Sequence, residues 1–300
     1  MNPVDGAVLL DKPVGVSSFK ALGPVKRALR GSKVGHTGTL DPFASGLLVA
    51  LCGRLTKLAG RLTDLDKTYE AVFEFGRETD TLDPEGTLVA EGELPSFDRI
   101  AQEIKGFSGT ISQRPPAYSA VHIDGKRAYE RARSGETVEL PLRRVSVRAL
   151  EVIGWEPPDL RVRMTVSSGT YVRSIARDLG YACGSVAYVR GLRRISVGRW
   201  QVSDAIAPEE FSPDRHVISA SRTVSAVPGL LRGVVTGSAA ERICNGVPLR
   251  REWFRLDGET EVASDQSHED IALFDDSGEL LAVVAGEQEG FSYRFVRPRQ

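Results

Sequence analysis

A glycine-rich loop, VGHTGTLDPFASG from Val34 to Gly46, carries the clearest candidate for chemistry, the carboxylate of Asp41. Gly35 and Gly38 allow the backbone to approach a ligand closely, and His36 can hydrogen-bond or stack while uncharged. A lone aspartate before a proline is, however, most often a turn residue. Two interpretations of Asp41 therefore stay open: a turn former, or a carboxylate placed to meet a ligand.

Several other kinds of site are excluded by residue spacing. The loop has neither the GxxxxGK[ST] nor the GxGxxG pattern, which argues against a nucleotide or dinucleotide site. No HExxH or paired-cysteine pattern occurs and the four histidines are scattered, so the sequence predicts no metal site. The absence of GxSxG removes the commonest serine-hydrolase signal.

Two further candidates lie on regular elements. GTYVRSIARDLG predicts a helix with Thr170 as N-cap, in which Arg173 and Arg177 share the face opposite the apolar one. An arginine on that face either projects into a cleft or stays solvated, and we expect Arg177 to be the solvated one. The alternating segment KTYEAVFEFG predicts a strand that buries Tyr69, which periodicity alone makes a core aromatic.

Composition bounds the class of protein. The chain has 300 residues, 41% of them hydrophobic, which is typical of a globular protein with about two domains. The longest apolar stretch, Leu47 to Cys52, is far shorter than the ~18 residues of a spanning helix, and the first residues lack a signal-peptide pattern. The three cysteines are widely spaced, unlike a disulfide framework. We therefore predict a cytoplasmic protein without a membrane segment.

The net charge of −1 conceals a split along the chain. Residues 1–204 carry 29 basic and 24 acidic side chains, a net of +5, whereas residues 205–300 carry 10 and 16, a net of −6. Of the 39 basic residues 31 are arginine, whose planar guanidinium suits bidentate contacts with phosphate. The basic part is compatible with a nucleic-acid partner. If the acidic part binds RNA, the contact must come from a few placed residues such as Arg250, Arg251 and Arg297, because the overall charge of this part would repel RNA.

Strands and helices alternate irregularly along the sequence, which predicts an α+β fold with a mixed or antiparallel sheet flanked by helices. The predicted strands include 8–10, 47–52, 67–76, 144–155 and 160–167. The first predicted helix begins at Ser17 or Ser18, ends at Gly31 and has the apolar residues Phe19, Leu22, Val25 and Leu29. Further helices are predicted near 54–62, after the cap Ser96, and as a short basic helix after the proline-rich segment QRPP. We divide the chain into a domain of residues 1–230 and a small β-rich domain of residues 231–300.

Six segments, in order over residues 8 to 200, resemble the motifs of the TruB-type pseudouridine synthases. They are LLDKPVGVSS, GHTGTLDPFASGLL, KTYEAVFEFGRETDTLDPEG, QRPPAYSAVHIDGKRAYERARSGE, SSGTYVRSIARDLG and GLRRISVG. The stretch from ERICNGVPL to FVRP is similar in length and pattern to the PUA domain that such enzymes carry. The resemblance implies a pseudouridine-synthase fold with a C-terminal PUA-like RNA-binding domain.

The same resemblance implies a reaction, the isomerisation of uridine 55 in the T-loop of tRNA, which needs no cofactor and no metal. It implies that Asp41 is the catalytic nucleophile, that Arg173 keeps its carboxylate ionised, and that Tyr69 stacks on the uracil ring. Addition to C6 of the uracil and attack on C1′ of the ribose both remain open.

An enzyme of this kind must flip the uridine out of the T-loop, and the resemblance implies that His36 fills the vacated space while Leu192 forms an apolar wall for the base. The expected phosphate contacts are Lys12, Arg143, Arg144, Arg193 and Arg194. We interpret Asp80 and Asp83 as turn residues. One departure from the family pattern is His122, which stands where a lysine is usual and puts one phosphate contact in doubt.

The expected partner is the T-arm or elbow of tRNA, bound by a monomer that needs no protein partner. Two alternatives stay open. A guide-RNA-dependent synthase of the dyskerin type shares the catalytic motifs, although those enzymes need partner proteins and a larger PUA region. A chaperone that binds and folds the tRNA elbow would need no catalysis.

Overall fold

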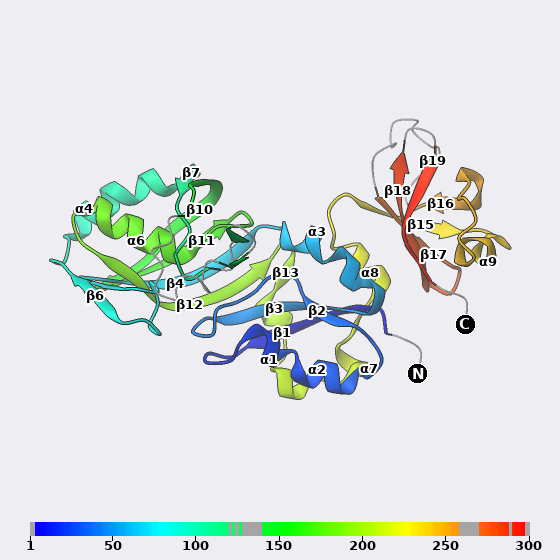
Figure 1. The fold of residues 1–300 in the computed structure, drawn as a ribbon, viewed down its shortest axis with the longest axis horizontal. Helices are drawn as coiled ribbons and strands as arrows, with labels where there is room; N and C mark the ends of the chain where they lie inside the picture. Colours follow the sequence, from blue (N-terminus) through cyan, green and yellow to red (C-terminus); the bar gives the residue numbers. More distant parts are fainter. Residues whose placement is uncertain are drawn as a thin grey trace.

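A computed structural model describes residues 4–119, 122–123, 126–127, 140–257, 270–287 and 290–297. An elongated molecule is built on a ten-stranded sheet with the strand order β14-β1-β3-β12-β4-β11-β10-β7, and with β2 and β13 pairing at its side (Figure 1). Its strands are β1 (Gly6–Lys12), β2 (Val34–His36), β3 (Ser45–Cys52), β4 (Lys67–Phe75), β7 (Gly109–Gln113), β10 (Arg143–Glu156), β11 (Asp159–Val166), β12 (Ala187–Val197), β13 (Trp200–Gln201) and β14 (Ile218–Ser219).

The pairing in this sheet is antiparallel except between β12 and β3, which run parallel. Around it lie α1 (Ser18–Ala21), α2 (Gly23–Ala28), η1 (Gly53–Leu58), α3 (Ala59–Thr63), α4 (Phe97–Glu103), η2 (Ile104–Phe107), α6 (Val172–Ala182), η3 (Val202–Asp204), η4 (Pro208–Glu210), α7 (Pro213–His216) and α8 (Ala220–Val224). Two hairpins are separate, β5 (Arg77–Thr79) with β6 (Leu88–Glu91) and β8 (His122–Ile123) with β9 (Lys126–Arg127). The predicted α+β class with a mixed sheet is confirmed.

Strand periodicity gives the sheet two buried faces at β1 and β3. Because successive side chains of a strand point to opposite sides, Val8 and Leu48 pack with α1 and α2 in one apolar cluster. Leu9 and Val49 pack with η1 and α3 in another. Both strands are therefore covered on both sides, as their nearly continuous apolar sequences require.

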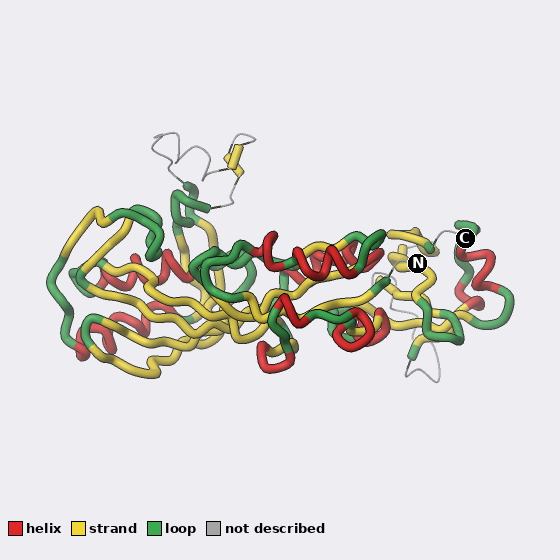
Figure 2. Tube along the Cα trace, turned by 90° about the horizontal axis from the view of Figure 1, so that it is seen from below, coloured by secondary structure: helices red, strands yellow, loops and turns green. Residues whose placement is uncertain are grey.

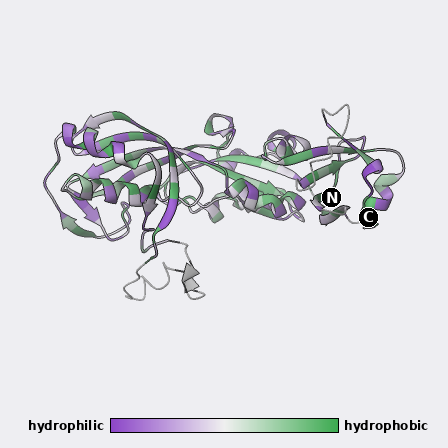
Figure 3. Cartoon of the chain, turned by 90° about the horizontal axis from the view of Figure 1, so that it is seen from above, coloured by the Kyte–Doolittle hydropathy of each residue, from purple (hydrophilic) through white to green (hydrophobic). Residues whose placement is uncertain are grey.

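The other half of the sheet buries one face only. Phe73 of β4 and Val162 of β11 pack beneath α6, while Arg161 and Arg163 of β11 point to solvent and are exposed. The alternation of hydrophilic and hydrophobic residues along these strands is visible in Figure 3. This arrangement leaves α6 on the face of the sheet that carries Tyr69.

A second sheet follows at the C-terminal end, with the order β16-β15-β17-β18-β19. Its strands are β15 (Leu230–Val235), β16 (Phe254–Leu256), β17 (Asp270–Phe274), β18 (Leu280–Glu287) and β19 (Gly290–Val296), accompanied by α9 (Ala239–Cys244) and η5 (Arg251–Trp253). Figure 2 shows this sheet at one end of the long axis. The strand-rich C-terminal region matches the prediction, whereas the boundary at residue 230 stays a prediction.

Three details of the predicted helices are wrong, two of them in the first helix. The helix expected from Ser17 to Gly31 is divided into α1 and α2, because Pro24 lies in the first turn of α2 and cannot continue α1. Phe19, expected on its apolar face, is 71% exposed.

The N-cap of α6 is Tyr171 rather than Thr170. The first turn is satisfied from another element, since the Gln113 side chain accepts a hydrogen bond from the Tyr171 backbone nitrogen at 2.8 Å. The expected basic helix after QRPP lies outside the described residues. Within the described ranges, no helix is long and apolar enough to cross a membrane.

Candidate active site

Asp41 lies in the loop that joins β2 to β3, and hydrogen bonds fix the backbone on both sides of it. The buried Ser18 hydroxyl accepts a hydrogen bond from the Leu40 nitrogen at 2.9 Å and donates one to the Leu40 carbonyl at 3.0 Å. The Gly15 nitrogen donates to the Pro42 carbonyl at 2.7 Å. The Asp41 carboxylate is thus held in place while its side chain stays 38% exposed.

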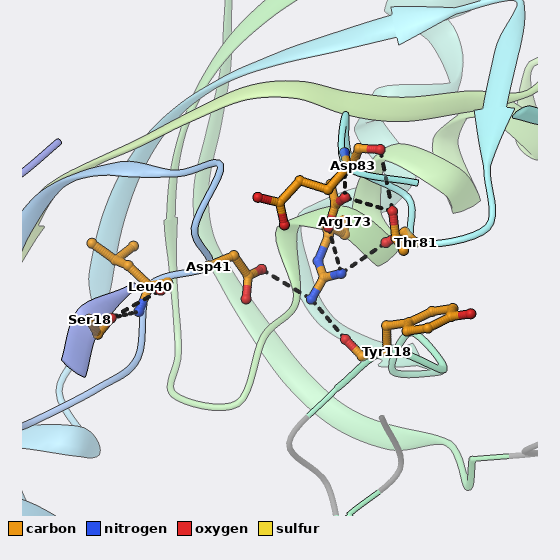
Figure 4. A network of polar contacts seen from close by, with 8 residues as sticks. Ser18, Leu40, Asp41, Thr81, Asp83, Tyr118 and Arg173 are labelled. Carbon is orange, nitrogen blue, oxygen red and sulfur yellow. Dashed lines mark hydrogen bonds and ion pairs between the residues drawn. The ribbon is translucent and has the colours of Figure 1, made fainter. Parts of the chain in front are cut away.

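Arg173 faces this carboxylate, with its Nη2 atom 3.0 Å from Oδ2 of Asp41. The guanidinium also donates to Oδ2 of Asp83 at 3.0 Å and to the carbonyls of Thr81 and Tyr118 at 2.8 and 3.0 Å. Figure 4 shows the guanidinium between Asp41 and the loop that carries Thr81 and Asp83. Helical periodicity alone favours a solvated position for Arg173. Its side chain is only 6% exposed, so Arg173 does not lie on a solvated face. It is buried and paired with two carboxylates at once.

Asp83, interpreted from the sequence as a turn residue, both shapes a turn and pairs with Arg173. Its Oδ1 accepts from the Thr81 hydroxyl at 2.6 Å and from the Glu85 nitrogen at 3.0 Å, which shapes the turn. Its Oδ2 pairs with Arg173. The signal that could have identified it is the arginine itself, because a buried guanidinium needs anionic partners.

The charges around Asp41 oppose one another. Burial raises the pKa of Asp41 and the nearby Asp83 carboxylate raises it further, whereas Arg173 and Lys12 lower it. Burial and the same two aspartates also raise the pKa of Glu85, which places this carboxyl near the site. Arg173 is therefore the main group that favours the ionised form of Asp41.

Two expected phosphate contacts, Lys12 and Arg194, are instead buried supports of the Asp41 loop. The Lys12 ammonium donates to the carbonyls of Pro13, Val16 and Pro42, and its side chain is completely buried. The Arg194 guanidinium donates to the carbonyls of Leu47 and Gly38 at 2.6 and 3.2 Å, at the two ends of the loop. Both cations are enclosed and hydrogen-bonded to backbone, and their role as phosphate contacts stays a prediction.

The other three expected phosphate contacts lie at the surface. Arg143 and Arg144 are exposed at the start of β10. Arg193 is 40% exposed and makes a bidentate pair with Asp11 at 2.7 and 3.0 Å. Arg143 and Arg144 therefore remain the most accessible of the five candidates.

His36, Tyr69 and Leu192 lie around the same loop. His36 ends β2 and its Nδ1 atom accepts a hydrogen bond from the Gly38 nitrogen at 3.4 Å. Tyr69 and Leu192 lie on neighbouring strands and border the apolar cluster into which Phe43 of the loop is inserted. Burial, Arg194 and Lys26 all lower the pKa of His36, so its imidazole is neutral at pH 7.

Arg177 lies apart from this site, but the expectation that it is solvated is wrong, because its side chain is only 15% exposed. Its guanidinium pairs with Asp178 at 2.7 Å and donates to the Arg114 carbonyl at 3.0 Å. In the C-terminal sheet, the candidate RNA contact Arg297 pairs with Glu279, and Arg250 lies 3.8 Å from Glu252. The side chain of His122 lies outside the described residues. The described part of the chain contains no group of three or more residues suited to a metal ion, which leaves the expectation of a metal-free site as a prediction.

Comparison with known proteins gives consistent results. Residues 26–172 match the family described as TruB family pseudouridylate synthase (N terminal domain). The chain is 37% identical over 296 residues to the tRNA pseudouridine synthase B of Borrelia garinii, covering 97% of this chain and 98% of that protein. It is 44% identical over 209 residues to the tRNA pseudouridine synthase B of Bordetella avium, covering 68% and 86% of the two chains. Among solved structures, a chain from the crystal structure of a Cbf5-Nop10-Gar1 complex is similar, with a TM-score of 0.69 and 26% identity over 98% of this chain and 87% of that one.

Proposed function

This chain belongs to the TruB family of pseudouridylate synthases, and from that premise we propose that it isomerises uridine 55 in the T-loop of tRNA, with Asp41 as the nucleophile. The enzyme is a tRNA pseudouridine synthase, an isomerase. In this reaction the glycosidic bond breaks, the uracil turns, and C5 becomes bonded to C1′. Because no net oxidation or reduction occurs, no cofactor is required.

The contact between Asp41 and Arg173 is the observation that carries this proposal. A nucleophilic carboxylate must be ionised, partly desolvated and held still. Asp41 is 38% exposed and lies 3.0 Å from a guanidinium that is itself buried and hydrogen-bonded to other groups. The carboxylate is thus open on the side from which a base would arrive and supported on the other.

Three residues around Asp41 would receive the flipped base. Tyr69 supplies an aromatic face, and stacking on a base contributes about 1–3 kcal/mol. Leu192, on the neighbouring strand, supplies an apolar wall. The neutral His36 imidazole fills the space that the uridine leaves without adding a charge. Asp41 then adds to C6 of the uracil or attacks C1′ of the ribose, and both routes begin from the same carboxylate.

The exposed Arg143 and Arg144 would contact phosphates of the T-arm, with Arg193 as a third contact. Residues 1–230 would form the synthase domain and residues 231–300 a PUA-like domain that adds RNA contacts. We infer that the enzyme acts as a monomer in the cytoplasm, without guide RNA or protein partner. Identity of 37% over nearly the whole chain with a tRNA pseudouridine synthase B supports a tRNA substrate rather than a guided one.

The test is to incubate the purified chain alone with an unmodified tRNA transcript and to map pseudouridine. We expect modification at uridine 55 alone. Product at another position would refute the assigned nucleotide, and product only after addition of guide RNA would support the dyskerin-like alternative. Binding without any product would support the chaperone.

The matched variant is Asp41→Asn, which we expect to bind tRNA but to release no tritium from 5-tritiated uridine. In this variant the buried Arg173 guanidinium keeps its pair with Asp83. Because the pKa of Asp41 is raised above its ordinary 3.8, ionisation of the native carboxyl lowers stability as the pH rises through that pKa. At pH 7 the variant should therefore unfold at a temperature no lower than that of the parent protein. Turnover by this variant would refute the nucleophile.

A further inference from the structure

One segment beside the Asp41 loop departs from the balanced charge of the chain. Residues 13–40 contain five basic residues and no aspartate or glutamate, in a protein with 39 basic and 40 acidic residues. The five are Lys20, Lys26, Arg27, Arg30 and Lys33. This run covers α1, α2 and the turn that leads into β2.

The fold turns these cations outward. Ala21, Leu22 and Val25 are buried against β1 and β3, so the remaining face of the two helices meets solvent. Lys20, Arg27, Arg30 and Lys33 are exposed there, and Lys26 is half-buried.

These cations also differ from the arginines of β11 in their pairing. On the solvent face of β11 the arginines are paired, Arg163 with Glu70 at 2.6 Å and Arg161 with Glu156 at 3.6 Å. Within the residues that the structure describes, none of the five cations of this segment lies within 4.0 Å of a carboxylate. Their charge is uncompensated, and it therefore attracts an anion from solution.

The same surface carries an aromatic ring. Phe19 is 71% exposed, and the Lys26 ammonium lies 3.9 Å from the centroid of its ring. An exposed aromatic among lysines and arginines suits a nucleic acid, which offers phosphates and stacking faces together.

The surface adjoins the candidate active site. Ser18, the first residue of α1, is hydrogen-bonded to Leu40 beside Asp41. Figure 4 shows Ser18 on one side of Asp41 and Arg173 on the other. Lys26 is also near enough to His36 to contribute to the lowering of its pKa.

We propose that this surface, formed by Phe19 and the five cations of residues 20–33, binds phosphates of the substrate RNA strand next to the nucleotide at Asp41. The proposal rests on the proposed function, because it takes RNA as the substrate. It adds a second group of phosphate contacts to the one proposed for Arg143, Arg144 and Arg193. The new surface lies on the Ser18 side of Asp41, opposite Arg173 (Figure 4). Continuity with the site favours RNA over an acidic protein as the occupant.

The experiment compares two triple variants with the same change in net charge. The first is Arg27→Gln, Arg30→Gln and Lys33→Gln, which leaves Lys26 and its neighbour His36 intact. The control is Arg77→Gln, Arg99→Gln and Lys105→Gln, which removes three exposed cations outside both this surface and the PUA-like region. The dissociation constant for a tRNA transcript is measured by filter binding over a range of KCl concentrations.

We expect the first variant to weaken binding about tenfold or more at moderate salt. The slope of log Kd against log salt should fall by about three, one for each phosphate that the variant no longer neutralises. The control should change both quantities much less. Equal effects in the two variants, or an unchanged slope in the first, would overturn the proposal.

Binding is measured without turnover, so failure of this surface and failure of the proposed function are distinguishable. If the parent protein bound tRNA but formed no pseudouridine, the proposed function would be refuted. The comparison of the salt slopes of the two variants would still test whether this surface binds RNA. If turnover occurs, the first variant should keep the single-turnover rate at saturating enzyme and show a higher KM. A lower rate at saturation with unchanged Kd would contradict a binding role.

Discussion

Arg173 shows how a single buried residue organises the candidate site. Its five N–H donors form a planar fork, and this fork reaches Asp41 on one side and Asp83, Thr81 and Tyr118 on the others. A lysine ammonium is a point charge that cannot span two carboxylates in this geometry. The position of the Asp41 carboxylate therefore depends on an arginine rather than on a positive charge alone.

Arg173→Lys should reduce turnover of tRNA strongly for this reason. Displacement of a reacting group by about 1 Å can cost about 100-fold in rate, and we expect a decrease in kcat of at least that order. The measurement is single-turnover kinetics with an unmodified transcript, with circular dichroism to check folding.

Arg177→Lys provides the control on the same helix. The Arg177 guanidinium contacts Asp178 and a backbone carbonyl instead of Asp41, so turnover should stay near that of the parent protein. Equal decreases in the two variants would mean that activity does not depend specifically on the pairing of Arg173 with Asp41.

The sequence could identify Asp41 but not the surroundings of Arg173. The loop composition alone leaves two interpretations of Asp41 open, and the resemblance of the ordered motifs selects the candidate nucleophile. Helical periodicity distinguishes only an apolar face from a polar one, and it favours solvent for Arg173. In the structure this polar face meets the turn of Asp83 instead of water. Such a tertiary contact cannot be predicted from a local sequence pattern.

At the scale of elements, the loop between β2 and β3 is held by side chains from three other segments. Ser18 of α1 binds Leu40, Lys12 of β1 binds Pro42, and Arg194 of β12 spans Gly38 and Leu47. All three are buried. Their hydrogen bonds connect the Asp41 loop to two strands and a helix, so the loop is anchored to the sheet beneath it.

The close approach of β12 to this loop requires glycine at position 46. Gly46 has a φ of +101°, and a Cβ atom there would lie 2.3 Å from the Arg194 carbonyl oxygen. Gly46→Ala should therefore lower the free energy of unfolding by about 2 kcal/mol or more, as measured by urea denaturation.

Gly35→Ala is the matched substitution at the other end of the loop. No atom lies within 4 Å of a Cβ built on Gly35, and its backbone is not left-handed, so its stability should stay within about 0.5 kcal/mol of the parent. A similar decrease at both positions would indicate that the loop tolerates no side chain at all, whatever the distance to β12.

Elements are predictable where periodicity is strong and less so at their ends. The alternation of KTYEAVFEFG matches β4, and the apolar run LLVALC matches most of β3. The predicted cap Thr170 is wrong because Gln113, distant in sequence, satisfies the first turn of α6. The helix from Ser17 is divided because Gly23 and Pro24 interrupt it, a signal that the sequence does contain.

At the scale of the whole molecule, the two sheets share one apolar core. Phe274 of β17 and Val283 of β18 are fully buried in the same cluster as Leu55 and Leu58 of η1. Across the same junction the Arg61 guanidinium lies 2.6 Å from the carboxylate of Asp270. The change in charge near residue 204 indicates two parts of the chain, but composition contains no information on how closely the parts pack.

A shared core predicts that both sheets unfold together. Trp155 reports on the main sheet, where it packs edge-on against Phe75 at 5.8 Å between ring centroids. Trp253 reports on the C-terminal sheet, where it is buried in a separate cluster. The chain has three tryptophans, so the two variants retain either Trp155 or Trp253 as the single tryptophan, and both should show the same urea midpoint by fluorescence.

Phe274→Ala makes this prediction more specific. Truncation of a buried phenylalanine costs about 3–5 kcal/mol, and because Phe274 belongs to the shared core, the midpoints of both reporters should fall together. The same substitution at Phe19, which is 71% exposed, should leave both nearly unchanged. If Phe274→Ala moved only the Trp253 transition, the C-terminal sheet would unfold independently, and the packing of η1 against β17 and β18 would contribute little to the stability of the synthase part.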